Sequence, residues 1–134
     1  MTNSIPYLDY WRKRQQRQQE YHQKLAKAAR EKVQEIAELL IAEYPIQKII
    51  LFGSLVKGNF HAESDLDLAV AGIPESLYFE ALAKVNHISD RPVDLKPLES
   101  LDEHFLKKVI ATGECIYASD DSDTITGDYH RHQQ

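Results

Sequence analysis

Three aspartates of this chain, Asp65, Asp67 and Asp94, could together hold metal ions. Asp65 and Asp67 are separated by one residue, so on a strand their side chains point to the same face, with about 7 Å between the Cα atoms. Asp94 lies on the next expected strand and joins them if the two strands are neighbours. Few basic residues are near these carboxylates in the sequence, so they repel one another, and a divalent cation relieves the repulsion. Hard oxygen ligands favour Mg²⁺ or Mn²⁺, which also bind substrate phosphates.

A short turn before these aspartates could bind phosphate. Gly53 and Ser54 directly follow an apolar run; glycine lets the backbone approach a ligand closely, and the next amide and hydroxyl can donate hydrogen bonds to phosphate oxygens. Lys57 and Gly58 extend this turn. A Gly-Ser pair and an Asp-x-Asp pair are each weak signals alone, but here ten residues separate them and a further aspartate follows on the next strand. The combination predicts a site in which phosphates lie beside the carboxylates.

The elements that position these residues follow from the periodicity of the apolar side chains. Short strands are expected over residues 48–52, 65–70 and 92–96. In the last two strands the aspartates face away from the apolar side chains. One helix should have Pro74 in its first turn, and another should begin at a capping box over residues 100–103 and end at Gly113.

A long helix is expected before the first strand. Residues 8–44 contain no glycine or proline, and Pro45 ends the run. The second half carries one apolar stripe that can pack on a sheet or a partner, formed by Leu25, Ala29, Val33, Ile36, Ala37, Leu40 and Tyr44. Residues 12–20 are polar on every side, which predicts an exposed extension or a part of a complex. Large apolar side chains at the tip either cap the fold or anchor a second subunit; they are Tyr7, Leu8, Tyr10 and Trp11.

Charge is distributed unevenly along the chain. From Tyr10 to Lys32 there are eight basic and two acidic residues, a net charge of +6, so the remainder carries −11 against a total of −5. The split suggests a basic arm on an acidic body, which can reach a partner, fold back on the body, or form a solvated helix face. A total of −5 speaks against a domain that wraps nucleic acid, so no direct nucleic-acid binding is expected.

The composition is that of one small globular domain, with 134 residues, 43% of them hydrophobic and 28% charged. The single cysteine, Cys115, cannot form an internal disulfide and fits a reducing compartment. The longest apolar runs are too short to span a bilayer, and the first residues lack an apolar signal core. We therefore expect a cytoplasmic protein with no membrane partner.

Three further side chains are expected to be secondary to the site. His61 lies between the phosphate turn and Asp65 and is a candidate for contact with substrate. Ser64 directly precedes Asp65 and is expected to support the turn. Cys115 lacks the signature of a nucleophile and is expected to pack near the last strand.

Residues 51–68, LFGSLVKGNFHAESDLDL, resemble the signature of the DNA polymerase β-type nucleotidyltransferase superfamily in its minimal (MNT) branch. The likeness covers roughly residues 48–117. It implies an α/β (α+β) fold in which helices flank a small mixed sheet, here preceded by the long N-terminal helix. The expected organisation is therefore a helix over residues 1–46, basic in its first half, a minimal nucleotidyltransferase core over 47–117, and a disordered tail over 118–134.

The resemblance also implies roles for the residues of the site. It implies that the Gly-Ser turn binds the triphosphate and that the carboxylates hold two Mg²⁺ ions. Nucleotide binding then falls on Gly53, Ser54, Lys57 and Gly58, and catalysis and metal binding fall on Asp65, Asp67 and Asp94. The first two aspartates would bridge both ions, whereas Asp94 would bind one ion and accept or orient the proton of the attacking hydroxyl. One position departs from the pattern, because many minimal members carry an arginine where this chain has Leu55, and Lys57 is the nearest cationic substitute.

Minimal nucleotidyltransferases of this kind resemble the MntA-like antitoxins of prokaryotic HEPN–MNT toxin–antitoxin pairs. That resemblance implies transfer of AMP from ATP to a tyrosine of a HEPN ribonuclease toxin, in a hetero-oligomer. About seventy residues of core leave no second domain to hold an acceptor, which favours an acceptor on a partner. Two alternatives stay open: an antitoxin that masks the toxin by binding alone, and a nucleotidyltransferase for a small molecule.

Overall fold

The computed structural model describes residues 6–119 of the chain. The tail expected to lack fixed structure begins at residue 118 and lies almost entirely outside this range. The helices and strands are α1 (Pro6–Glu43), β1 (Lys48–Phe52), α2 (Ser54–Lys57), β2 (Leu66–Ala71), α3 (Tyr78–Ile88), β3 (Val93–Pro97), α4 (Glu103–Thr112) and β4 (Glu114–Ala118), with short 3₁₀ turns η1 (Glu75–Leu77) and η2 (Leu98–Ser100). None of the described helices combines the length and the apolar character needed to cross a membrane.

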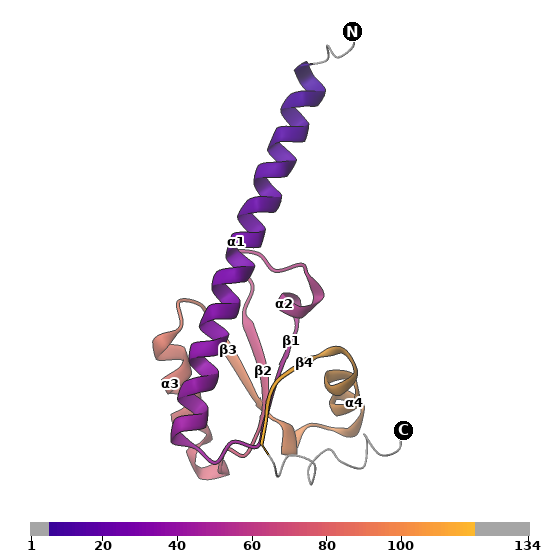
Figure 1. Ribbon diagram of the computed structural model, residues 1–134. Helices are drawn as coiled ribbons and strands as arrows, with labels where there is room; N and C mark the ends of the chain where they lie inside the picture. The colour runs from indigo at the N-terminus through magenta and orange to yellow at the C-terminus, as the bar shows by residue number, and fades with distance from the viewer. Residues whose placement is uncertain (1–5, 120–134) are drawn as a thin grey trace.

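The four strands form one mixed sheet in the order β3-β2-β1-β4. Strand β1 runs antiparallel to both β2 and β4, whereas β2 and β3 are parallel. The parallel pair is joined through α3, as a crossover connection requires. This small mixed sheet with flanking helices confirms the predicted α+β fold (Figure 1).

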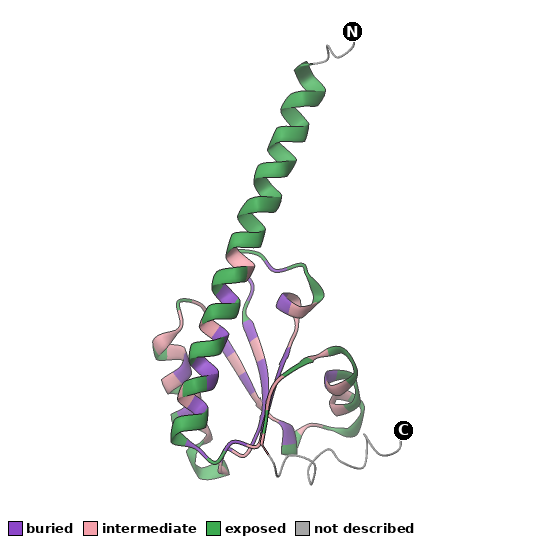
Figure 2. Cartoon of the chain, viewed as in Figure 1, coloured by how far each residue is buried: buried purple, intermediate pink, exposed green. Residues whose placement is uncertain are grey.

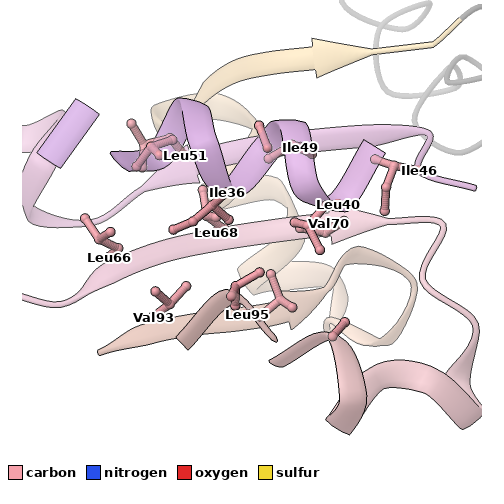
Figure 3. Packing of buried hydrophobic residues seen from close by; sticks show 14 of the residues in the cluster. Ile36, Leu40, Ile46, Ile49, Leu51, Leu66, Leu68, Val70, Val93 and Leu95 are labelled. Carbon is pink, nitrogen blue, oxygen red and sulfur yellow. The ribbon is translucent and has the colours of Figure 1, made fainter. Parts of the chain in front are cut away.

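One face of the sheet is covered by the second half of α1 and by α3. Leu66, Leu68 and Val70 alternate along β2 and pack with Ile36 and Leu40 of α1 in the main core (Figure 3). All five are fully buried. The alternation of side chains along the strand therefore sends the intervening residue, Asp67, to the opposite face.

The opposite face is partly covered by α4. Ile50 of β1, Ala69 of β2 and Val109 of α4 belong to a second, smaller core, against which Phe105 packs. This helix is capped by Asp102, whose side chain accepts a hydrogen bond from the Phe105 amide at 2.9 Å. At the end of β1, the ring of Phe52 contacts that of Phe105 edge to face, with centroids 5.9 Å apart.

Two predicted helix starts are wrong. The capping box over residues 100–103 does not form, because Ser100 belongs to η2 and the next residue is extended, which moves the N-cap to Asp102. Pro74 precedes the 3₁₀ turn η1, and α3 begins only at Tyr78, because Leu77 leaves the helical conformation. The end of the second helix at Gly113 is confirmed, and the Gly113 amide donates to the Val109 carbonyl.

The first half of α1 extends away from the rest of the molecule as a straight arm (Figure 1). Residues 6–24 are exposed, whereas Ala29, Val33 and Ile36 are buried against the sheet (Figure 2). The exposed extension and the buried stripe are thus both confirmed. Tyr7 is 67% exposed and Trp11 is 42% exposed, so the aromatic tip does not cap this fold. The two rings contact each other edge to face, with centroids 6.2 Å apart.

Candidate active site

The candidate site begins at the junction between β1 and α2. The chain turns at Gly53, which has φ of 84° and ψ of −155°, a conformation that favours glycine. An ideal Cβ at this position would lie 2.2 Å from Oδ2 of Asp67, so glycine also lets the turn approach that carboxylate. The structure therefore brings the predicted phosphate turn directly against one predicted catalytic aspartate.

Asp67 and Asp94 are neighbours across the parallel pair of strands. The register pairs Asp67 of β2 with Asp94 of β3, and on its other side Asp67 pairs with Phe52 of β1. Burial raises the pKa of the Asp67 carboxyl above its ordinary value, and the charges of Asp94 and Asp65 raise it further. A positive charge beside this carboxylate would offset both the burial and the repulsion from its acidic neighbours.

Asp65 lies just before β2 and is exposed. The loop that leads to it is held by Arg91, whose guanidinium donates hydrogen bonds to the carbonyls of His61, Ala62 and Ser64 at 3.2, 3.3 and 2.7 Å. The same guanidinium lies 4.5 Å from the ring centroid of the buried Phe60. Arg91 therefore fixes the path of the backbone into Asp65.

Ser64 supports this loop as predicted, and His61 takes part in it too. The Ser64 hydroxyl accepts a hydrogen bond from the His61 amide at 3.0 Å, and the Ser64 amide donates to the His61 carbonyl. Nδ1 of His61 accepts from the Glu63 amide at 3.2 Å, and the residue is exposed. Contact of His61 with substrate stays a prediction.

The remaining predicted binding residues lie on α2 and at its end. The Ser54 carbonyl accepts hydrogen bonds from the amides of Gly58 and Asn59, and Gly58 adopts the left-handed conformation that ends α2. Lys57 is exposed, and its charge lowers the pKa of Asp67, opposing the acidic neighbours. Leu55 is buried in the main core, so this position faces away from any phosphate at the turn.

The expectation that the carboxylates lack a basic partner is wrong. Nζ of Lys96 lies 3.2 Å from Oδ2 of Asp94, because both residues point to the same face of β3. Its charge also lowers the pKa of Asp67. Lys96 thus supplies part of the positive charge that offsets the carboxylates of Asp94 and Asp67.

The carboxylates have the oxygen donors that Mg²⁺ requires, and the raised pKa of Asp67 favours a cation there. Within residues 6–119, however, no three histidine, cysteine, aspartate or glutamate side chains are placed to hold one metal ion together. Lys96 lies against one oxygen of Asp94, so a metal ion shared by Asp65, Asp67 and Asp94 would compete with this ion pair.

Three residues near the site were not predicted from the sequence, because their positions depend on tertiary contacts. Lys96 and Arg91 act through contacts that depend on strand pairing and loop path, and Phe52 becomes a neighbour of Asp67 only through the antiparallel register. Asp94 and Lys96 are two residues apart in the strand expected over 92–96, so the alternation of side chains puts them on one face, and this was the one available signal. Cys115 lies on β4 and is exposed.

A family model matches most of this chain. The model described as "Polymerase beta, Nucleotidyltransferase" matches residues 34–122, which include the turn and all three aspartates but not the arm. No curated protein matches the chain.

Solved structures extend this similarity to particular complexes. A crystal structure of a toxin–antitoxin with AMP-PNP has a chain with 26% identity and a TM-score of 0.60, with 75% of this chain and 88% of that chain covered. A crystal structure of the toxin–antitoxin MntA–HepT gives 25% identity and a TM-score of 0.57, with coverage of 78% and 89%. A structure of a tri-AMPylated Shewanella oneidensis HEPN toxin in complex with its MNT antitoxin gives 23% identity and a TM-score of 0.56, with coverage of 78% and 88%. At 23% identity this last similarity concerns the fold.

Proposed function

This chain belongs to the polymerase beta nucleotidyltransferase family, and from that membership we propose that it is the antitoxin of a toxin–antitoxin pair. It transfers AMP from ATP to a tyrosine hydroxyl of a cognate HEPN ribonuclease toxin and thereby neutralises the toxin. The observation that carries the proposal is the contact between the Gly53 turn and Asp67, with Asp94 paired beside it. The likeness to chains of toxin–antitoxin complexes, one of them with AMP-PNP, supports the choice of partner and nucleotide.

The proposed reaction is an in-line displacement at the α-phosphorus of ATP. The tyrosine oxygen forms a bond to this phosphorus, the bond to the oxygen that bridges to the β-phosphate breaks, and pyrophosphate leaves. Gly53 and Ser54 bind the departing phosphates, and the carboxylate of Asp94 receives the hydroxyl proton. Two Mg²⁺ ions, when bound by the three aspartates, supply positive charge that offsets the phosphate charge and lowers the pKa of the acceptor hydroxyl.

The open position of the site suits an acceptor carried by another protein. Asp65 and Lys57 are exposed, and Asp67 and Asp94 are half-buried on the face that α4 covers only in part. A tyrosine on a helical partner can therefore reach the carboxylates without opening the fold. The proposed setting is the prokaryotic cytoplasm, where ATP and magnesium are available together.

A second candidate is an antitoxin that masks the toxin by binding alone. The ion pair between Asp94 and Lys96 favours it, because a lysine beside a catalytic carboxylate partly replaces a metal ion. In that case the aspartates are remnants of an active site and the protective surface lies elsewhere.

Mass spectrometry of the two purified proteins tests both candidates. Incubation of the chain with a cognate HEPN protein, ATP and Mg²⁺ should raise the mass of that protein by one or more AMP units and release pyrophosphate. Cleavage of RNA by the HEPN protein should stop in step with the transfer. The substitutions Asp65→Asn and Asp67→Asn should abolish the mass change, whereas Asp90→Asn, an exposed aspartate outside the site, should leave it intact.

The same experiment can also refute the transfer of AMP. If neither the wild type nor the variants transfer AMP, and all of them still block RNA cleavage, masking by binding is the mechanism and the transfer reaction is refuted. Ser54→Ala is the graded test of the turn, because loss of its hydroxyl should slow the transfer without abolishing it.

A further inference from the structure

A hollow of about 160 Å³ lies beside the candidate site, between the end of β1 and α4. We infer that this hollow binds the terminal phosphates of a nucleoside triphosphate and that Lys108 is a phosphate-binding residue. The inference rests on the proposed function for the identity of the nucleotide. It assigns to α4 a role in substrate binding that the motif around Gly53 does not contain.

The hollow has two walls that come from distant parts of the sequence. One wall is the end of β1 with the turn and α2, and the other is a single face of α4. The lining residues are Phe52, Gly53, Lys57, Phe105, Lys108, Val109 and Thr112. The α4 members follow one another at spacings of three, one and three residues, as residues on one side of a helix do. Lys108 therefore faces the same space as Lys57, although the two are far apart in the sequence.

The charges in the hollow point to an anion. Lys84, Lys96 and Lys107 each form ion pairs with carboxylates within 4 Å. Lys57 and Lys108, in contrast, form no ion pair with any residue in the range 6–119. Two ammonium groups that line one small hollow repel each other, and a multiply charged anion between them removes this repulsion. Phosphate oxygens are the natural ligands for such a pair.

The location of the hollow matches the order of phosphates in the substrate. Gly53 is part of both sites, because it lines the hollow and its missing Cβ leaves room for the Asp67 carboxylate. With the α-phosphate at Asp67 and Asp94, the β- and γ-phosphates continue across Gly53 toward Lys57 and Lys108. Those two phosphates form the leaving pyrophosphate, so Lys108 binds the part of the substrate on which negative charge develops.

The burial of Leu55 gives this inference further weight. Leu55 packs in the main core, and Lys57 is the only basic residue of α2. A triphosphate carries more charge than one lysine neutralises. Lys108 on α4 supplies the second positive charge from outside the motif.

Calorimetric titration of the full chain with ATP, ADP, AMP and inorganic tripolyphosphate, each with Mg²⁺, tests the inference. The variants are Lys108→Ala and the matched control Lys107→Ala. Lys107 is the preceding residue on α4, is exposed like Lys108, and pairs with Glu103 at 3.4 Å. Lys108→Ala should weaken the binding of ATP and of tripolyphosphate by roughly tenfold, which is the scale of one charge-assisted contact. The same substitution should leave the affinity for AMP unchanged. Lys107→Ala should change none of the four affinities, and Lys108→Arg should restore ATP binding.

The other possible results separate a failure of this inference from a failure of the proposed function. Equal ATP affinity in the wild type and Lys108→Ala would show that Lys108 does not bind phosphate, while the transfer of AMP to the partner could still occur. An equal loss for ATP and AMP would show that the hollow holds the nucleoside. A third result is that Lys108→Ala weakens the binding of tripolyphosphate while the wild type transfers no AMP to the partner. That result would support the phosphate site and contradict the proposed function.

Discussion

The carboxylate of Asp67 occupies the space that a side chain at Gly53 would need. Oδ2 of Asp67 lies 2.2 Å from the position of an ideal Cβ on Gly53, a distance that real Cβ contacts do not reach. The phosphate turn and the acidic site are thus one packed unit, and a change in the turn displaces the carboxylate directly.

Substitution of Gly53 by alanine should therefore damage both stability and the site. Gly58→Ala is a matched control, because Gly58 also has a positive φ, of 87°, but an added Cβ there meets nothing within 4 Å. Backbone strain alone should lower the free energy of unfolding of Gly58→Ala by about 1 kcal/mol. Gly53→Ala should lower the free energy of unfolding further, by about 2–4 kcal/mol, because the clash of the added Cβ with Asp67 adds to the backbone strain. Urea unfolding and ATP titration of both variants test this prediction. Equal losses of stability and of ATP affinity in the two variants would contradict it.

Asp67→Asn should stabilise the protein in the absence of metal while it abolishes AMP transfer. The folded state raises the pKa of Asp67, mainly by burial and then by Asp94 and Asp65, so the ionised carboxylate destabilises the fold. Stability from this group is present below its ordinary pKa of 3.8 and is lost as the pH rises through the raised value. The variant should be more stable than the wild type at pH 7 in EDTA, and the two should have nearly the same stability near pH 3. Lower stability of the variant at pH 7 would show that Asp67 is favourably paired.

The ion pair between Arg30 and Glu114 should make a small, pH-dependent contribution to stability. Arg30 of α1 donates two hydrogen bonds to Glu114 of β4, at 2.9 and 3.1 Å, and these lower the pKa of the Glu114 carboxyl. Such a group stabilises the fold above its ordinary pKa of 4.5, and this stability is lost as the pH falls through the lowered value. Both side chains are nearly half exposed, so Glu114→Gln should cost no more than about 1 kcal/mol at pH 7. Urea unfolding of both proteins should show a smaller difference in the free energy of unfolding at pH 3 than at pH 7.

Removal of residues 1–19 should leave the fold almost unchanged in stability. Residues 6–19 are exposed and bury no core surface, so the free energy of unfolding should change by less than about 0.5 kcal/mol. Leu40→Ala is the contrasting variant, because Leu40 is fully buried and its truncation should cost about 2–5 kcal/mol. The shortened chain should associate more weakly with a partner or a second copy, as sedimentation would show. A large fall in melting temperature with association intact would reverse the roles assigned to the two halves of α1.

The strands were predictable because their side chains alternate strictly between two environments. Residues 48–52 form β1 as expected, and the strands expected over 65–70 and 92–96 are shifted by one residue at each end. The first residues of the helices were harder to predict than the strands, because an N-cap depends on the backbone conformation of a single residue. Ser100 and Asp102 are both good caps by residue type, and the 3₁₀ turn η2 decides between them.

Only those features of the candidate site that lie within one strand or one turn could be predicted from the sequence. The spacing of Asp65 and Asp67 sets their common face, whereas the pairing of Asp67 with Asp94 depends on the parallel register, which the sequence leaves conditional. Lys108 and Arg91 enter the site region through tertiary packing and carry no local signal. Side chains that complete a site from distant elements thus remain invisible until the fold is known.

The arm changes how the size of this protein must be measured. A continuous helix of 38 residues is about 57 Å long at 1.5 Å per residue, and only its second half lies against the sheet. The free half adds friction with little mass, so one copy diffuses like a larger sphere. Gel filtration should therefore assign a single 15.4 kDa chain an apparent mass that suggests a dimer. Light scattering, which reads mass without reference to shape, is the measurement that can count the copies.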